Sequence, residues 1–254
     1  MPLDPTSLQI LAEEFDATAA RLLGAEEEPQ SVQSDGLLSP RPLIEAMQRI
    51  LQLLPLLPDQ PQGTGTEVHP DRTQAAHDIH QLGDYGFHLL ADLTAIADRL
   101  KRPDLSREFE GLCLPLAVWI ARRGGTLSTL EPIVNAIAFQ ANALREPLDL
   151  EKLYFLTGEV QLAVAPLLQR DPDKTNPGRP WRVLLFNRAI IATRSHRLTL
   201  IEAAYDDLIM RLPEDAPQFF RQGMEQMVAL DYPQPVRNLV EKYYNLWSVE
   251  RTLH

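Results

Sequence analysis

The feature that most constrains this chain is the spacing of its apolar residues, which recur every three or four positions in one segment after another. Near the N-terminus the pattern comprises Leu8, Leu11, Phe15, Ala19 and Leu22. This spacing gathers side chains on one face of an α-helix, whereas no segment shows the sustained two-residue alternation that is typical of a β-strand. Proline occurs 21 times, mostly between these segments, where it begins or ends helices. The pattern predicts an all-α protein built from many packed helices.

The apolar spacing and the prolines together predict where these helices lie. They are expected at about 6–23, 43–54, 71–101, 105–123, 129–145, 149–169, 181–194, 198–212, 216–230 and 235–250. Gly24 and the pair Gly124-Gly125 are predicted to end helices, and Asp149 to cap the start of one. Pro115 and Pro166 should each kink or end a helix locally. The segment 181–194 is apolar nearly all round, which predicts a central, mostly buried helix.

Two polar segments suggest how the chain is divided. One runs from the acidic Glu26 to Pro40, and the other covers 58–70 and is rich in Pro, Gly and Thr. They predict an N-terminal two-helix arm over 1–66 and an all-helical main domain over 67–254, arranged as an antiparallel and partly solenoid-like array. The apolar face of the arm must be buried, either on its own chain or by exchange with a second copy, which would give a homo-oligomer.

The last third of the chain has the spacing of a helical repeat. Two helix pairs start roughly 35 residues apart, at 181 and 216, within the range of helix-turn-helix repeats. Leu212-Pro213-Glu214-Asp215 and Arg170-Asp171-Pro172-Asp173 resemble the turns that close tetratricopeptide-type repeats. The small and aromatic residues of that consensus do not fall in register here. The resemblance implies a solenoid-like packing of this region.

Charge and composition exclude several classes of protein. The formal net charge is −11, so the chain lacks the basic face that a sequence-independent nucleic-acid binder needs. No apolar stretch approaches the roughly 20 residues of a membrane span, and Met1-Pro-Leu-Asp-Pro lacks the features of a signal peptide. Cys113, the single cysteine, has apolar neighbours and is expected in the core. We therefore expect a cytoplasmic protein without a cofactor.

Histidines and aspartates share one face of the predicted helix 71–101. They are His77, His80, Asp84, His88 and Asp92. Imidazole and carboxylate at three- and four-residue steps can share a metal ion, but the apolar stripe of this helix points in the opposite direction. A polar face in solvent is therefore expected, and a metal site there is the alternative.

The dipeptide His77-Asp78 resembles the central pair of HD-type metal phosphohydrolases, which are all-helical enzymes. That resemblance implies a metal-dependent hydrolase that uses the His77–Asp92 face. The family's pattern also requires a histidine on a separate upstream helix, whereas His69 lies only eight residues earlier and beside Pro70. No other catalytic motif is present, which favours a protein that is not an enzyme.

The last two predicted helices carry adjacent aromatic residues, which cannot all face one side of a helix. The set comprises Phe219, Phe220, Tyr243, Tyr244 and Trp247. These residues either seal the core of the helix pair or reach a groove where a partner binds, since Tyr and Trp are favoured at binding surfaces. The sequence thus predicts a non-catalytic interaction or scaffold module for a peptide or protein partner, with the HD-like hydrolase as the alternative.

Overall fold

The protein is all-α, as its apolar spacing predicts. A computed structural model of the chain describes residues 8–26, 39–57 and 70–247. About 80% of the described residues are helical, and these ranges contain no strand, only an isolated bridge between Leu127 and Val164. In chain order the helices are α1 (Leu8–Glu26), α2 (Arg41–Leu53), the short 3-10 helix η1 (Leu54–Leu56), α3 (Pro70–Arg99), α4 (Pro103–Gly111), α5 (Cys113–Arg122), α6 (Glu131–Ala143), α7 (Pro147–Ala163), α8 (Pro166–Gln169), α9 (Pro180–Arg194), α10 (Leu198–Arg211), α11 (Ala216–Ala229) and α12 (Gln234–Trp247).

The chain forms two compact units. The first contains residues 1–140 and 159–172, and the second contains residues 141–158 and 173–254. The division at residue 66 that the linkers predict falls inside the first unit and stays a prediction. The linkers themselves lie largely outside the described residues. The solenoid-like repeat also stays a prediction.

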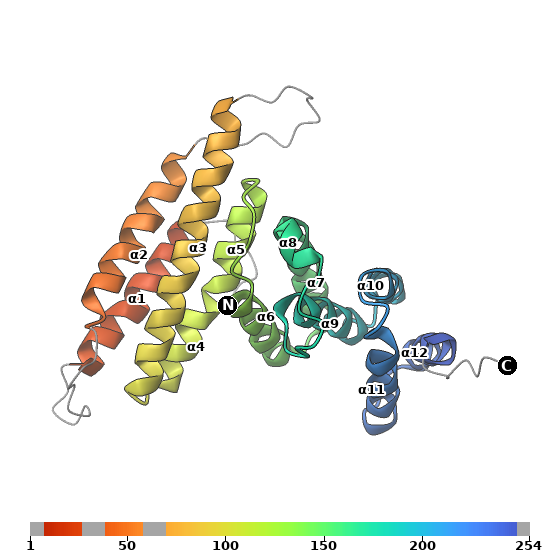
Figure 1. Ribbon diagram of the computed structural model, residues 1–254. Coiled ribbons are helices and arrows are strands. Elements are labelled where there is room, and N and C mark those ends of the chain that lie inside the picture. Colours follow the sequence, from red (N-terminus) through yellow and green to blue (C-terminus); the bar gives the residue numbers. More distant parts are fainter. Residues whose placement is uncertain (1–7, 27–38, 58–69, 248–254) are drawn as a thin grey trace. The chain divides into compact units, whose positions relative to one another are not determined.

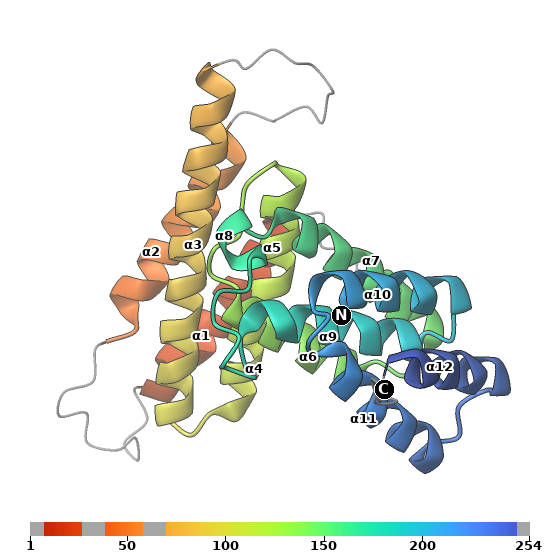
Figure 2. The same cartoon turned by 45° about the vertical axis from the view of Figure 1, so that its right-hand side comes forward.

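The first unit is a bundle in which α1, α2, α3 and α4 run side by side in alternating directions (Figures 1 and 2). Helix α1 packs on α2, α4 and α5, and α3 packs on α2, α4 and α5. The apolar stripe of α1 is buried along its whole length, from Leu8 through Phe15 to Leu22. The two N-terminal helices therefore dock on their own chain in this structure.

Several helix ends differ from those predicted. Helix α1 continues through Gly24 to Glu26, because burial of Ala25 extends the packed face beyond the glycine. The segment 105–123 is divided into two helices, α4 and α5, that meet at Leu112, which agrees with the prediction that Pro115 breaks its helix locally. Pro115 explains this break: its ring would clash with the carbonyl of the residue four positions earlier, Gly111, where α4 ends.

The segment 149–169 was predicted correctly to break at Pro166, but its start was predicted wrongly. Pro147 begins α7 instead of preceding it, which suits proline because the first helical position needs no amide hydrogen. Asp149 thus lies inside the first turn, where it accepts a hydrogen bond from Lys152. Pro166 starts the short helix α8 after α7 has ended at Ala163.

The pair Gly124-Gly125 ends α5, as predicted. Gly124 has a φ of 75°, the left-handed conformation that favours glycine after a helix. Gly125 passes close to two buried β-branched side chains, so that a Cβ atom there would lie 2.7 Å from a methyl group of Ile79 and of Ile120. This close approach brings the segment after α5 against α3.

In the second unit α9 packs on α10, and α12 packs on both α10 and α11 (Figure 2). An ion-pair cluster fixes the starts of α9 and α11. The carboxylate of Asp215, at the start of α11, accepts hydrogen bonds from Arg179 and Arg182. The guanidinium of Arg182 also stacks over the ring of Phe186, 4.0 Å from its centroid. These contacts hold α9 and α11 beside each other.

Candidate partner-binding pocket

The structure separates the five aromatic residues that the sequence singles out. Phe219, Phe220 and Tyr243 are buried, Tyr244 is half-buried, and Trp247 is exposed at the end of α12. The two phenylalanines lie on α11 and the other three residues on α12. Most of the set therefore contributes to the interior of the second unit. The prediction that these residues bind a partner stays a prediction.

The buried aromatic rings pack around Tyr205 of α10. The centroid of its ring lies 5.0 Å from that of Phe220, 5.1 Å from that of Tyr243 and 5.7 Å from that of Phe219, each in an edge-to-face arrangement. Edge-to-face pairs of this kind add to the energy of burial. Burial and a hydrogen bond to the carboxylate of Asp206 raise the pKa of Tyr243. The result is an aromatic wall in the interior of the second unit.

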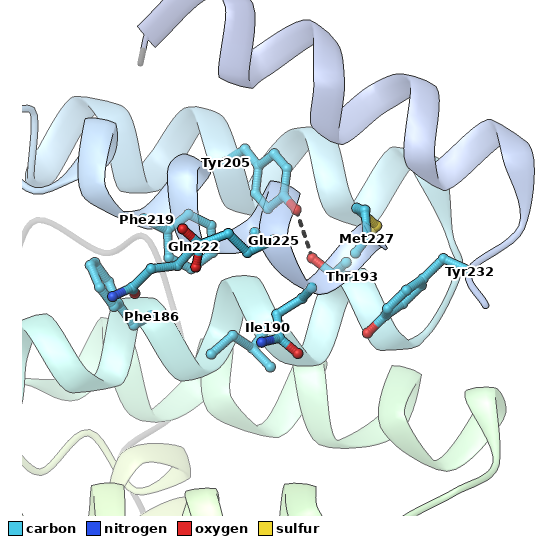
Figure 3. A pocket seen from close by; sticks show the side chains of 11 residues that line it. Phe186, Ile190, Thr193, Tyr205, Phe219, Gln222, Glu225, Met227 and Tyr232 are labelled. Atoms are coloured by element: carbon cyan, nitrogen blue, oxygen red, sulfur yellow. Dashed lines mark hydrogen bonds between the residues drawn. The ribbon is translucent and has the colours of Figure 1, made fainter. Parts of the chain in front are cut away.

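A pocket of about 380 Å³ lies against this wall, within the second unit (Figure 3). Its lining comes from three helices and the segment after α11. The residues are Phe186, Ile190 and Thr193 of α9, Tyr205 of α10, Phe219, Gln222, Gly223, Glu225, Gln226 and Met227 of α11, and Tyr232.

The lining is apolar inside and polar at the rim. Ile190 is 45% exposed although it sits among aromatic residues, so the pocket leaves apolar surface in contact with solvent. On α11 the exposed side chains of Gln222, Glu225 and Gln226 provide two carboxamides and one carboxylate. Apolar pockets with a few convergent polar groups are the usual form of a ligand site.

One hydrogen bond inside the pocket wall connects α9 to α10. The hydroxyl groups of Thr193 and Tyr205 lie 2.8 Å apart, and both side chains are buried (Figure 3). Because the Thr193 hydroxyl also donates to the carbonyl oxygen of Ala189, the Tyr205 hydroxyl is the donor of the pair. Burial raises the pKa of Tyr205, so this hydroxyl stays protonated and keeps its donor role.

Phe186, Ile190, Met227 and Tyr232 line the pocket but were not among the sequence candidates. Phe186 and Ile190 belong to the helix that is apolar nearly all round, so the sequence does not distinguish the residues that line a pocket from those in the core. Tyr232 comes from the turn between α11 and α12, and burial raises its pKa. The only sequence signal for the pocket was the adjacent pair Phe219-Phe220.

The five candidate metal ligands on α3 lie in two different environments. His77, His88 and Asp92 are exposed, as the helix's own apolar stripe predicts. His80 and Asp84 are half-buried, however, because the segment after α5 covers them. The ring nitrogen Nδ1 of His80 lies 2.8 Å from the carbonyl oxygen of Thr126, and Asp84 accepts a hydrogen bond of 3.1 Å from the amide of Thr129. These two residues hold that segment on α3.

No group of three or more His, Cys, Asp or Glu residues is placed to hold a metal ion within the described part of the chain. Cys113 is buried, and burial raises the pKa of its thiol. Its reactive thiolate form is therefore disfavoured.

Every helix within 8–26, 39–57 and 70–247 is too short or too polar to cross a membrane.

Comparisons with models of protein families, with curated proteins and with solved structures found no match to this chain. Its function is therefore inferred from the geometry of the site.

Proposed function

We propose that this protein is a non-catalytic interaction module, and that its pocket between α9 and α11 accepts an apolar side chain of a protein or peptide partner. The observation that carries the proposal is the pocket itself, a cavity of about 380 Å³ whose inner wall is aromatic and whose edge exposes Ile190. Bulky apolar anchors in desolvated pockets supply most of the energy of many protein interfaces.

The rim indicates the chemistry of the partner. Glu225 and Gln226 lie three and four residues after Gln222, so the three side chains share one face of α11. Glu225 is the charged group among the residues that line the pocket. The whole chain carries a formal net charge of −11, which favours association with basic segments. The partner segment should therefore combine a bulky apolar residue with a Lys or Arg, as an amphipathic helix does.

Selection of peptides from a random display library against the full-length protein tests this proposal. Enriched peptides should share a bulky apolar anchor with a nearby Lys or Arg. The substitution Ile190→Arg places a charge at the pocket edge and should weaken binding of these peptides about tenfold or more. Met210→Arg is the matched control, because Met210 is 69% exposed on α10 and does not line the pocket.

Equal loss of binding in both variants, or none in either, would count against the pocket.

The HD-like metal-dependent hydrolase is the competing function, and the described ranges provide no observation in its favour. Metal analysis of the purified full-length protein distinguishes the two functions, because stoichiometric bound metal would support the hydrolase.

We propose a cytoplasmic location for this interaction module, which agrees with its single, buried cysteine because disulfides are rare in that compartment. Exchange of the N-terminal arm with a second copy would give a homo-oligomer. Light scattering of the full-length protein at several concentrations tests it. A monomer at all concentrations would exclude the exchange.

A further inference from the structure

Two buried hydroxyl groups, those of Thr193 and Tyr205, line the pocket of the second unit. Thr193 is 6% exposed and Tyr205 is 2% exposed. The Thr193 hydroxyl donates its hydrogen to the carbonyl oxygen of Ala189 at 2.8 Å, and the Tyr205 hydroxyl donates its hydrogen to Thr193, also at 2.8 Å. A hydroxyl group has a single hydrogen to donate, so both donors are already used.

These hydroxyl groups still have the capacity to accept hydrogen bonds. Among the described residues, no donor reaches the Tyr205 oxygen, and only Tyr205 donates to the Thr193 oxygen. Figure 3 shows the two groups directed toward each other among the side chains that line the pocket. Burial raises the pKa of Tyr205, so its hydrogen stays in the bond to Thr193. The buried side chains of this wall can therefore accept a hydrogen bond from a ligand but cannot donate one.

The other polar side chains of the lining lie at its edge. Gln222 and Gln226 carry donors, but both side chains are exposed and can stay hydrated. Tyr232 is half-buried, and its ring packs edge-to-face on that of His196, with 5.6 Å between the centroids. The carboxylate of Glu225, also exposed, is a further acceptor. The pocket thus favours an apolar ligand group that donates a hydrogen bond.

We infer that the partner inserts a tryptophan side chain into this pocket and donates its indole N–H to the Tyr205 oxygen. This assignment rests on the proposed function and names the side chain that binds. Tryptophan is the neutral side chain that has a strong donor and no acceptor. A Tyr, Asn or Gln would also bring an acceptor to a wall that has no free donor, and a buried polar group left unpaired is costly. A Phe or Leu would fill the space but leave the Tyr205 oxygen unpaired.

The size and the apolar part of the pocket also suit an indole ring. A volume of about 380 Å³ lies at the lower end of the range for pockets that hold small organic ligands, so a two-ring side chain fits. Phe186 and Phe219 supply aromatic surface, with their ring centroids 4.9 Å apart in an edge-to-face arrangement. Further edge contacts with an indole would add to the energy of burial. Trp is also one of the residues that most often dominate binding at interfaces.

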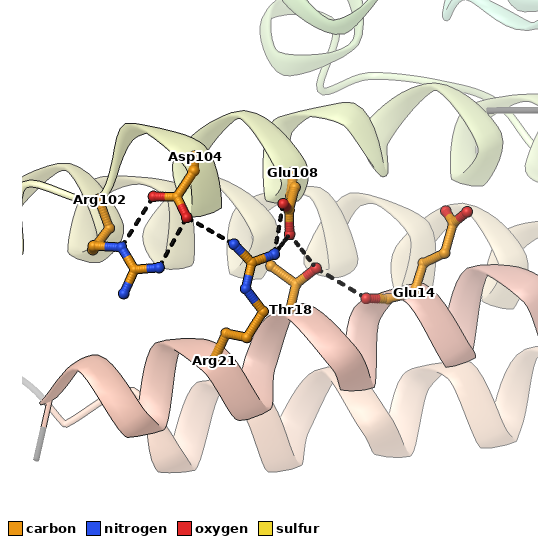
Figure 4. Close-up of polar contacts among 6 residues, drawn as sticks. All are labelled: Glu14, Thr18, Arg21, Arg102, Asp104 and Glu108. Carbon is orange, nitrogen blue, oxygen red and sulfur yellow. Dashed lines mark hydrogen bonds and ion pairs between the residues drawn. The ribbon is translucent and has the colours of Figure 1, made fainter.

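The hollow of the first unit, beside α1 and α4, has a different chemistry (Figure 4). Asp104 and Glu108 line it and are held in ion pairs. Arg21 donates hydrogen bonds to Glu108 at 2.6 Å and to Asp104 at 2.7 Å, and Arg102 donates to Asp104 at 2.8 Å. A neutral indole does not replace a counter-ion in such a network. We therefore assign the tryptophan anchor to the pocket of the second unit alone.

The test is a titration of the isotope-labelled full-length protein with two peptides, followed by NMR. One capped peptide contains a Trp and an Arg. In the other, benzothienylalanine replaces the Trp, which keeps the two-ring shape, puts sulfur in place of the N–H and makes the ring more apolar. The Trp peptide should shift the amide signal of Gly223, which lines the pocket, and should bind about fivefold more tightly. Gly111, in the hollow of the first unit, should show no shift.

A variant that carries both Thr193→Val and Tyr205→Phe lacks the two hydroxyl groups and should lose the preference for Trp. Replacing both partners of a hydrogen bond by apolar groups of similar shape costs little stability, and thermal melts check that the variant is folded. Thr157→Val is the matched control. It removes a buried hydroxyl that donates to the carbonyl oxygen of Tyr154 and does not line the pocket, so it should leave the preference intact.

Equal affinity of the two peptides, or tighter binding of the benzothienylalanine peptide, would overturn the tryptophan assignment. The proposed function would then still stand, because both peptides would occupy the pocket and shift Gly223. A preference for Trp that persists in the double variant would also overturn the assignment. Absence of binding by both peptides up to about 5 mM would instead count against the assignment and the proposed function together.

Discussion

The substitution Phe15→Ala tests whether the N-terminal helix docks on its own chain. Phe15 is fully buried at the middle of α1, and its ring centroid lies 6.0 Å from that of Phe109 on α4. Leu11 and Leu22 are also buried, so they hold α1 in place on either side and limit how far the cavity can collapse. Loss of a buried phenylalanine under these conditions costs about 3–5 kcal/mol of the free energy of unfolding.

Differential scanning calorimetry of the full-length protein measures this cost. For a unit of this size, each kcal/mol lowers the melting temperature by about 2–4 °C, so the first unit should melt roughly 6–20 °C lower. Ile10→Ala is the control on the same helix, because Ile10 is 44% exposed and its loss should cost no more than about 1 kcal/mol. The double variant with Phe109→Ala should reveal a coupling of about 0.5–1.5 kcal/mol between the two rings.

Equal melting temperatures for Phe15→Ala and Ile10→Ala would refute this reasoning. The stripe of α1 would then not be packed on α4 in solution. In that case the amphipathic helix would be better placed to recognise an external partner.

Four further substitutions test contacts between helices. Thr193→Val should cost about 1–3 kcal/mol, because it leaves the buried Tyr205 hydroxyl without an acceptor, whereas Tyr205→Phe should cost less, about 1 kcal/mol. Urea denaturation measures both costs. A larger cost for Tyr205→Phe than for Thr193→Val would contradict the assignment of the Tyr205 hydroxyl as the donor. Gly125→Ala should lower the stability of the first unit by about 1–3 kcal/mol through overpacking against α3 and α5. An unchanged melting temperature would show that the neighbouring methyl groups move aside freely. Asp215→Asn should lower the free energy of unfolding by roughly 3 kcal/mol, because the nearly buried guanidinium groups of Arg179 and Arg182 lose this carboxylate. An unchanged urea denaturation curve would show that the ion-pair cluster does not stabilise the fold.

The sequence predicted the helices well because helix formation leaves a local signature. The spacing of Leu8, Leu11 and Phe15 follows from the geometry of a single helix, and these side chains are indeed buried on one face. Prolines and the pair Gly124-Gly125 marked most helix ends for equally local reasons. The errors occurred where a local signal had two meanings, since Pro147 can either follow one helix or begin the next, and Gly24 can either end a helix or lie inside it.

The sites depended on contacts between segments that are far apart in the chain. His80 and Asp84 were expected in solvent because their own helix turns its apolar stripe the other way, yet the segment 126–129 covers them. Nothing in the sequence around α3 encodes that approach.

The pocket of the second unit shows the same limit most clearly. The sequence by itself determined that α9 and α11 are helices and that Phe219 and Phe220 cannot both face one side. Only the tertiary structure decided that Phe220 enters the core while Phe219 also lines a pocket with Ile190 and Tyr232. The physical reason is that apolar periodicity fixes which face of a helix is buried, whereas a cavity arises from imperfect contact between faces of several helices. That contact depends on long-range packing and leaves no periodic trace in any one segment.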